Sequence, residues 1–122
     1  MFGKDNGRLE SYIGAKSDFT GDFSAKGTLR VDGQVNGRLN ADCVILSENA
    51  TIKGDIVAKR IIVGGKVEGN LKAQELVEIK SKGMVCGDIS TNKLSIAEGA
   101  VFSGKSSMQR DESKIVEFQA KG

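Results

Sequence analysis

The sequence predicts an all-β protein that folds as a single-domain parallel β-helix, or solenoid, of about six rungs. Three observations support this fold class: a short motif recurs along the chain, its apolar residues alternate with period two, and its repeat is too short for paired helices. The motif has the form small-x-apolar-x-Gly-x-apolar-x-small. It is clearest as GQVNGRLNA at residues 33–41.

Copies of the motif start at residues 17, 33, 50, 65, 83 and 99, so the repeat length varies between 15 and 18 residues. Self-similarity at such a spacing is typical of a solenoid, whereas a helical repeat would need about 33 to 45 residues. Between copies lies a second apolar pair, such as Val44 and Leu46. Period-two alternation is strand spacing. Each unit therefore predicts one turn of a β-helix, with corners at Gly- or Asn-bearing turns.

The chain divides into one domain and two tails. We expect residues 1–11 to form a flexible N-terminal tail, residues 12–107 the β-helix domain, and residues 108–122 a second tail. The C-terminal tail is polar apart from a small apolar group, which is too short to fold alone and is interpreted as a docking segment. That group comprises Ile115, Val116 and Phe118.

Composition limits the partners and the compartment. A net charge of +2 without a run of like charges argues against a nucleic-acid partner. No stretch approaches the roughly 20 apolar residues of a membrane span, and the N-terminus lacks the apolar centre of a signal peptide. Cys43 and Cys86 are expected at outward positions too far apart for a disulfide. Free thiols are typical of a reducing compartment, so we expect a cytoplasmic protein.

A phosphate-binding pattern, G-x4-G-K-S, occurs as GAVFSGKS at residues 99–106. In such a loop Lys105 would contact the outer phosphates and Ser106 a magnesium ion. Only sixteen residues follow, which leaves no room for the rest of a nucleotide-binding sheet. The repeat explains the segment instead, with Gly99 at the corner, Val101 inward and Ser103 at the inner Gly position. We therefore expect no cofactor.

A second candidate site is a set of carboxylates at one repeat position, since β-helices can carry glycosidase or lyase acids. The full column shows polar and opposite charges alternating, which is typical of a solvated ladder: Asp22, Arg38, Asp55, Asn70 and Asp88. A neighbouring outward column shows no convergence of acids: Thr20, Asn36, Lys53, Glu68, Cys86 and Phe102. Because the sequence has no His, a His-based catalytic triad and a metal site of the usual, His-containing kind are both excluded. We expect no catalytic or metal residues, although a β-helix enzyme or binding module acting on polysaccharide stays as the alternative.

Aromatic residues lie only near the two ends of the chain, with none between residues 24 and 101. They are Phe2, Tyr12, Phe19, Phe23, Phe102 and Phe118. A solenoid without polar caps exposes strand edges and core at its ends. One interpretation is that these rings plug the ends beneath the tails; the other is that subunits join end to end by β-augmentation. The second interpretation predicts a polymerisation interface at Tyr12, Ile13, Phe19, Phe23, Val101 and Phe102.

The stretch IGAKSDFTGDFSAKGTLRVDGQVNGRL at residues 13–39, with the later GDI and EGNL repeats, resembles the bactofilins. This resemblance covers about residues 12–107, and bactofilins are a bacterial polymer-forming cytoskeletal family. It implies a right-handed β-helix of three short sheets. It also implies end-to-end assembly into non-polar filaments without nucleotide, which scaffold membrane-associated cell-envelope or cell-shape machinery. The chain has no Pro, whereas bactofilin tails are often Pro-rich.

The resemblance further suggests a peripheral location at the inner face of the cytoplasmic membrane, with cell-wall enzymes or other scaffold clients as partners. Met1, Phe2 and Lys4 are the expected membrane contacts. Two apolar side chains and nearby cations bind a membrane weakly, but linked tails in a filament bind together with high effective concentration. The alternative is a disordered tail without a membrane role.

Overall fold

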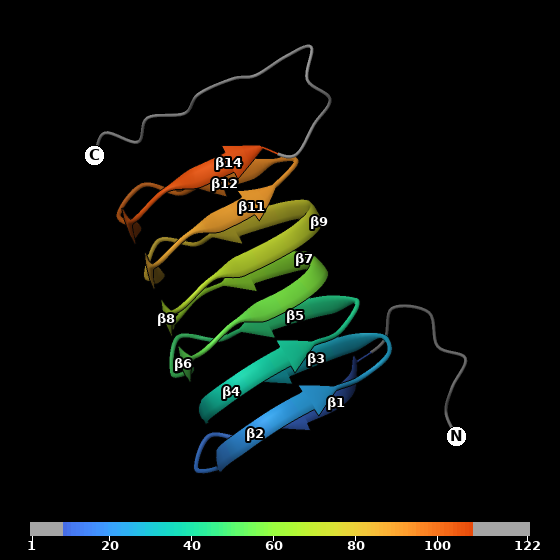
Figure 1. Ribbon diagram of the computed structural model, residues 1–122. Helices are drawn as coiled ribbons and strands as arrows, with labels where there is room; N and C mark the ends of the chain where they lie inside the picture. The colour runs from blue at the N-terminus through green and yellow to red at the C-terminus, as the bar shows by residue number, and fades with distance from the viewer. Residues whose placement is uncertain (1–8, 109–122) are drawn as a thin grey trace.

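The computed structural model describes residues 9–108, which form fourteen β-strands and no helix. Every strand pairing is parallel, and the chain winds upward as a solenoid of about six turns (Figure 1). The predicted all-β parallel β-helix is therefore confirmed. Each turn contributes strand segments to three faces, here called faces A, B and C.

Face A begins with the first halves of β2 (Asp18–Ser24) and β4 (Gln34–Asn40). Above them stack β6 (Thr51–Lys53), β8 (Lys66–Glu68), β10 (Met84–Cys86) and β13 (Val101–Ser103). One inward residue from each strand lies directly over the next because the pairing is in register. This column is Phe19, Val35, Ile52, Val67, Val85 and Phe102.

Face B is built from the second halves of β2 and β4, the first parts of β7 (Ile56–Val63) and β9 (Leu71–Ile79), β11 (Ile89–Thr91) and β14 (Ser106–Met108). Its inward column is Phe23, Leu39, Ile56, Leu71, Ile89 and Ser106. The column is thus apolar until the last turn, where a hydroxyl replaces an aliphatic side chain.

Face C contains β1 (Leu9–Ile13), β3 (Thr28–Val31), β5 (Cys43–Leu46), the second parts of β7 and β9, and β12 (Leu94–Ile96). Its inward residues include Leu29, Val44 and Ile61, all fully buried. Strand β1 starts at Leu9 and pairs with β3 from its first residue, so the expected start of order at residue 12 is too late. Residues 9–11 belong to the stack and not to a tail.

Glycines mark the bend between faces A and B in every turn. Gly37 and Gly54 have φ angles of 145° and 149°, which L side chains rarely adopt. A Cβ atom on Gly54 would also collide with the carbonyl oxygen of Gly37 in the turn below. The inner Gly of the motif is therefore required by backbone geometry and by the close approach of successive turns.

The last turn corrects one part of the sequence interpretation. Phe102 pairs with Val85, and Ser103 pairs with Cys86, so Phe102 points inward and Val101 outward. The prediction of an inward Val101 and of Ser103 in the inner Gly position is wrong, as is the place of Phe102 in an outward column. The reason is one extra residue: Ala100, not Gly99, forms the corner, since its N–H donates to Ala97 as Gly83 N–H donates to Lys80.

Two expectations from composition can be compared with the described chain. Both cysteines are free, with Cys43 half-buried on face C and Cys86 exposed on face A, as predicted. Burial raises the pKa of the Cys43 thiol. Within residues 9–108 there is no helix with the length and hydropathy of a membrane span.

Candidate polymerisation interface

Among residues 9–108, the two ends of the stack leave strand edges unpaired. At the N-terminal end β1 pairs only with β3, and β2 only with β4. At the C-terminal end β12, β13 and β14 each pair only with the strand below (Figure 1). Unpaired edges expose backbone N–H and C=O groups that another strand can bind. The described structure therefore offers a β-strand template at both ends.

The N-terminal end is lined by aromatic side chains of β2. Phe19 and Phe23 pack edge to face, with ring centroids 5.6 Å apart and an interplanar angle of 85°. Both are partly buried against the core, whereas Ile13 on β1 is only 8% exposed. The first turn therefore ends in a partly open apolar surface.

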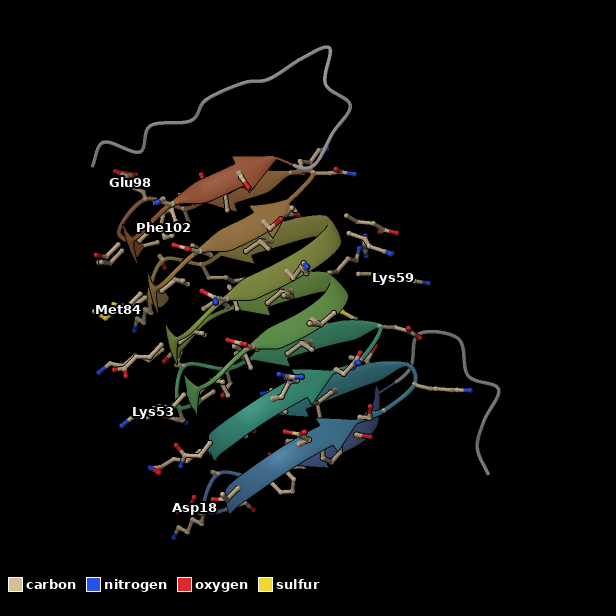
Figure 2. The ribbon with its side chains drawn as sticks, in the orientation of Figure 1. Asp18, Lys53, Lys59, Met84, Glu98 and Phe102 are labelled. Carbon is tan, nitrogen blue, oxygen red and sulfur yellow. The ribbon has the colours of Figure 1, made fainter. Side chains whose placement is uncertain are left out.

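The C-terminal end is also apolar, on two of its three faces. Phe102 on β13, labelled in Figure 2, is half-buried and packs against the core. The aliphatic residues Leu94 and Ile96 on β12 do the same. Face B ends instead at Ser106. The two ends thus differ: one carries two phenylalanines packed edge to face, and the other a single phenylalanine with aliphatic and hydroxyl neighbours.

The structure separates the six predicted interface residues into two groups. Ile13, Phe19, Phe23 and Phe102 point inward at the terminal turns, where an adjoining subunit would cover them. Tyr12 and Val101 are 55% and 47% exposed and lie on the outer rim of those turns. The rim residues contribute backbone edges to the ends, but their side chains face sideways.

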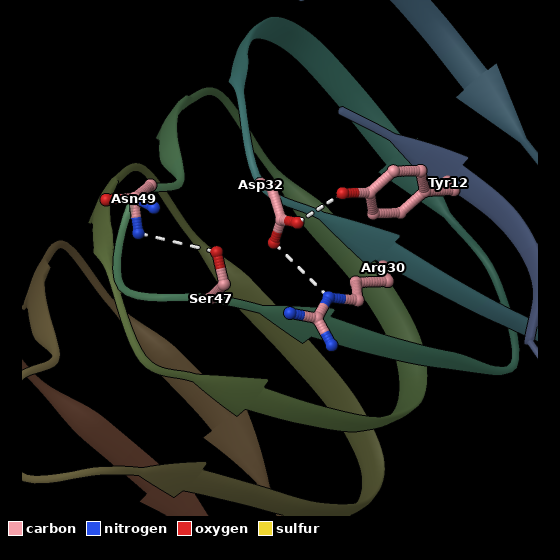
Figure 3. A network of polar contacts seen from close by, with 5 residues as sticks. All are labelled: Tyr12, Arg30, Asp32, Ser47 and Asn49. Atoms are coloured by element: carbon pink, nitrogen blue, oxygen red, sulfur yellow. Dashed lines mark hydrogen bonds and ion pairs between the residues drawn. The ribbon is translucent and has the colours of Figure 1, made fainter. Parts of the chain in front are cut away.

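Tyr12 belongs to a polar network that the sequence did not reveal. Its hydroxyl donates to Asp32 Oδ2 at 2.5 Å, and Arg30 Nε donates to Asp32 Oδ1 at 3.2 Å (Figure 3). Hydrogen bonds from Ser47 and Tyr12 hold the pKa of the buried Asp32 carboxyl below its usual value. The bond to Asp32 in turn raises the pKa of Tyr12. The network ties the edge strand β1 to the turn after β3.

The second candidate, the carboxylate column, is confirmed in register and extended by Lys105. Asn70 N–H donates to Asp55 Oδ1, and Asp88 N–H donates to Asn70 Oδ1, both at 3.2 Å. In the part of the chain that the structure describes, no three His, Cys, Asp or Glu side chains gather as metal ligands would. The column therefore reinforces the stacking of turns.

The phosphate-binding pattern is part of the same ladder. Gly104 occupies the bend between β13 and β14, with a φ of 148°, so the segment is strand, bend and strand. A phosphate-binding loop instead joins a strand to a helix whose N-terminus faces the phosphates. Lys105 stands next to Asp88 in the outward column of face B. The expected membrane contacts Met1, Phe2 and Lys4 lie outside the described residues, as do Ile115, Val116 and Phe118.

Within residues 9–108, the stack is a β-solenoid whose terminal turns expose strand edges and apolar side chains, which is typical of structural proteins that self-associate. The comparison with known families agrees: the family described as "Bactofilin: Polymer-forming cytoskeletal" matches residues 11–107. The chain belongs to the bactofilin family, as the resemblance in its sequence suggested. This family is a structural, cytoskeletal class.

Individual relatives support the assignment. The chain is 30% identical to bactofilin BacO of Myxococcus xanthus over 101 residues, covering 82% of this chain and 80% of BacO. It is 32% identical to BacP of the same organism over 97 residues, which span 79% of this chain but 40% of BacP. The fold matches bactofilin from Thermus thermophilus, solved as double helical filaments, with a TM-score of 0.74 and 24% identity over 82% of this chain and all of that one.

Proposed function

We propose that this protein is a cytoskeletal subunit that assembles end to end into filaments. The observation that carries the proposal is the presence, at both ends of one stack, of unpaired strand edges next to half-buried aromatic side chains. Joining two ends extends the hydrogen-bonded ladder and removes apolar surface from water at the same time. Each large apolar side chain that becomes fully buried contributes up to about 1.5 to 3 kcal/mol.

Assembly needs no nucleotide in this account. Both driving forces, strand pairing and apolar burial, are present in the folded subunit itself. The one phosphate-binding pattern in the sequence is a rung of the ladder, with Lys105 beside Asp88. Calorimetry with ATP and magnesium is expected to show no binding heat, and micromolar binding would contradict this part of the proposal.

The sharpest test of assembly is Phe102→Arg examined by electron microscopy. A charge placed at the C-terminal junction would have to be desolvated without a partner, which costs several kcal/mol. The variant is expected to keep its strand content by circular dichroism while losing filaments. Met84→Arg is the matched control, because Met84 lies one turn lower on face A and points outward (Figure 2). Normal filaments from Phe102→Arg would refute a junction at this end.

We also propose that the filaments lie at the inner face of the cytoplasmic membrane and scaffold cell-envelope machinery. The proposal rests on the leading residues Met1, Phe2 and Lys4, and on the regular side faces that a filament repeats along its length. Linked tails bind far more strongly than one tail. In sedimentation with anionic liposomes, wild type is expected to pellet strongly, and Phe2→Glu or the non-polymerising Phe102→Arg weakly. Equal pelleting of all three would contradict it.

A further inference from the structure

The outer side of face B carries one charged or amide residue per turn along its whole length. It runs up the front of the stack over β2, β4, β11 and β14 (Figure 1). From bottom to top this charged column is Asp22, Arg38, Asp55, Asn70, Asp88 and Lys105. Beside it runs a mostly small, neutral column: Ser24, Asn40, Val57, Lys72, Ser90 and Ser107.

Among residues 9–108, the cations of this surface have no ion-pair partner. The ion pairs among residues 9–108 join Arg30 to Asp32, Arg60 to Glu75, and Lys82 to Glu48. None of them involves Arg38, Lys72 or Lys105. A valley of about 640 Å³ runs between the two columns and is lined by these three cations together with Asp55 and Asp88. The charges are therefore open to another molecule.

The order of the charges is self-complementary. Upward it reads negative, positive, negative, neutral, negative, positive. Consider a two-fold axis parallel to the strands and midway between the turns of Asp55 and Asn70. It sets Asp22 opposite Lys105 of a second copy and Arg38 opposite Asp88 of that copy. It also sets Asp55 opposite Asn70 of the second copy, with Lys72 in the adjacent column. Every charge of the charged column then faces an opposite charge or an amide.

Shifting the axis by half a turn, or pairing the copies in parallel, loses this match. An axis through the turn of Asp55 sets that carboxylate against itself and Asp22 against Asp88. An axis through the turn of Asn70 sets Arg38 against Lys105 and Asp55 against Asp88. A parallel pair, related by an axis along the stack, sets the charged column against the neutral one. Axes one full turn away keep opposite charges together but leave the charges of two turns without a facing partner. Only the axis between the turns of Asp55 and Asn70 pairs the whole column.

We infer that face B is a self-association surface on which two copies of this protein pair side by side in antiparallel orientation. The contact is isologous, so each ion pair occurs twice. Val57, 38% exposed, lies at its centre and faces the aliphatic stem of Lys72 from the other copy. Single exposed ion pairs contribute little, but complementary charges fix register and reject wrong partners.

Filaments strengthen the pairing by repetition. The contact itself is a property of the folded subunit, but its multiplication along a filament rests on the proposed end-to-end assembly. Linked copies that pair in one register hold each other with high effective concentration. Because the contact is electrostatic and exposed, salt is expected to separate the pairs before it dissolves the filaments.

A charge swap tests this inference by electron microscopy at low salt. Wild type is expected to form paired filaments, and Arg38→Glu single filaments of unchanged length, since two carboxylates then face each other. Adding Asp88→Lys to Arg38→Glu is expected to restore pairing. In one copy these residues are three turns apart, roughly 14 Å by rung spacing, so the rescue has to act between copies.

The matched control combines Arg38→Glu with Asp22→Lys. These residues are neighbours within one copy, so the swap repairs the internal ladder but sets like charges against the second copy. It is expected to leave filaments single. Single wild-type filaments, or rescue by Asp22→Lys in place of Asp88→Lys, would overturn the inference. If neither wild type nor any variant forms filaments, the proposed function fails, and sedimentation velocity of the same proteins then tests the pairing by itself. Dimers of wild type and of Arg38→Glu with Asp88→Lys, but not of the other variants, would support the pairing. The absence of wild-type dimers would refute it.

Discussion

The middle and the ends of this solenoid are built from the same motif but differ in what covers them. In the middle, aliphatic residues such as Ile52 and Ile61 are fully buried, because turns above and below exclude water. At the ends the equivalent positions hold Phe19 and Phe102, which stay half-buried. The difference teaches that position in the stack decides a residue's role: the middle determines folding, and the ends are the surfaces that we propose for assembly.

The largest effect is expected from the glycine column of the middle. Gly54→Val is expected to destabilise the subunit by about 3 kcal/mol or more, because a side chain would need both a rare φ and the space of a carbonyl oxygen. Urea unfolding followed by circular dichroism, in the Phe102→Arg background, would measure it. Gly14→Ala is the control, since its Cβ would meet nothing closer than 3.6 Å. A stable Gly54→Val subunit would contradict the close-approach argument.

A smaller effect is expected from replacing isoleucine by alanine, once in the buried middle and once at the C-terminal end. Ile52→Ala is expected to cost about 2 to 5 kcal/mol, because it leaves a cavity at a fully buried site. Ile96→Ala at the C-terminal end is expected to cost about 1 to 2 kcal/mol in the monomer, where water already reaches the side chain. In wild-type filaments the cost of Ile96→Ala should rise. Equal costs in monomer and filament would argue that Ile96 is not at a junction.

The smallest effect concerns the network at the N-terminal edge. Because the folded pKa of Asp32 lies below its ordinary value of 3.8, its stabilising bonds are fully present above about pH 4 and are lost as the pH falls through the folded value. Tyr12→Phe removes one of these bonds. The double variant that combines Tyr12→Phe with Phe102→Arg is expected to have a slightly lower urea midpoint at pH 7 than Phe102→Arg alone. The difference should shrink toward pH 3, and a constant difference would show that Asp32 is not the partner that matters.

Much of the fold follows directly from the sequence. Period-two alternation and a repeat of 15 to 18 residues left room only for a strand solenoid, and the registers of the central turns are those of the motif. The last turn was misread because a single extra residue moves every side chain to the opposite face. Gly99 matches the motif better than Ala100 does, and the structure distinguishes them by the hydrogen bond to Ala97 and by the pairing of β13 with β10.

The candidate site was predictable in part. The clustering of aromatic residues identified the two ends, but the side to which Tyr12 points depends on how β1 pairs with β3. The bond between Tyr12 and Asp32 joins residues 20 positions apart and has no sequence pattern. The charged column of face B was visible as a ladder. Its complementarity to a second copy depends on the register of the last turn, which places Lys105 at the top.

The most direct measurement of the central claim is amide hydrogen exchange of wild-type filaments compared with the Phe102→Arg monomer. Strand edges that are unpaired in one subunit should become hydrogen-bonded across a junction. We therefore predict strong new protection in β2 and β13 and little change in the middle strands β6 and β8. Equal exchange of β2 and β13 in both samples would contradict an end-to-end ladder.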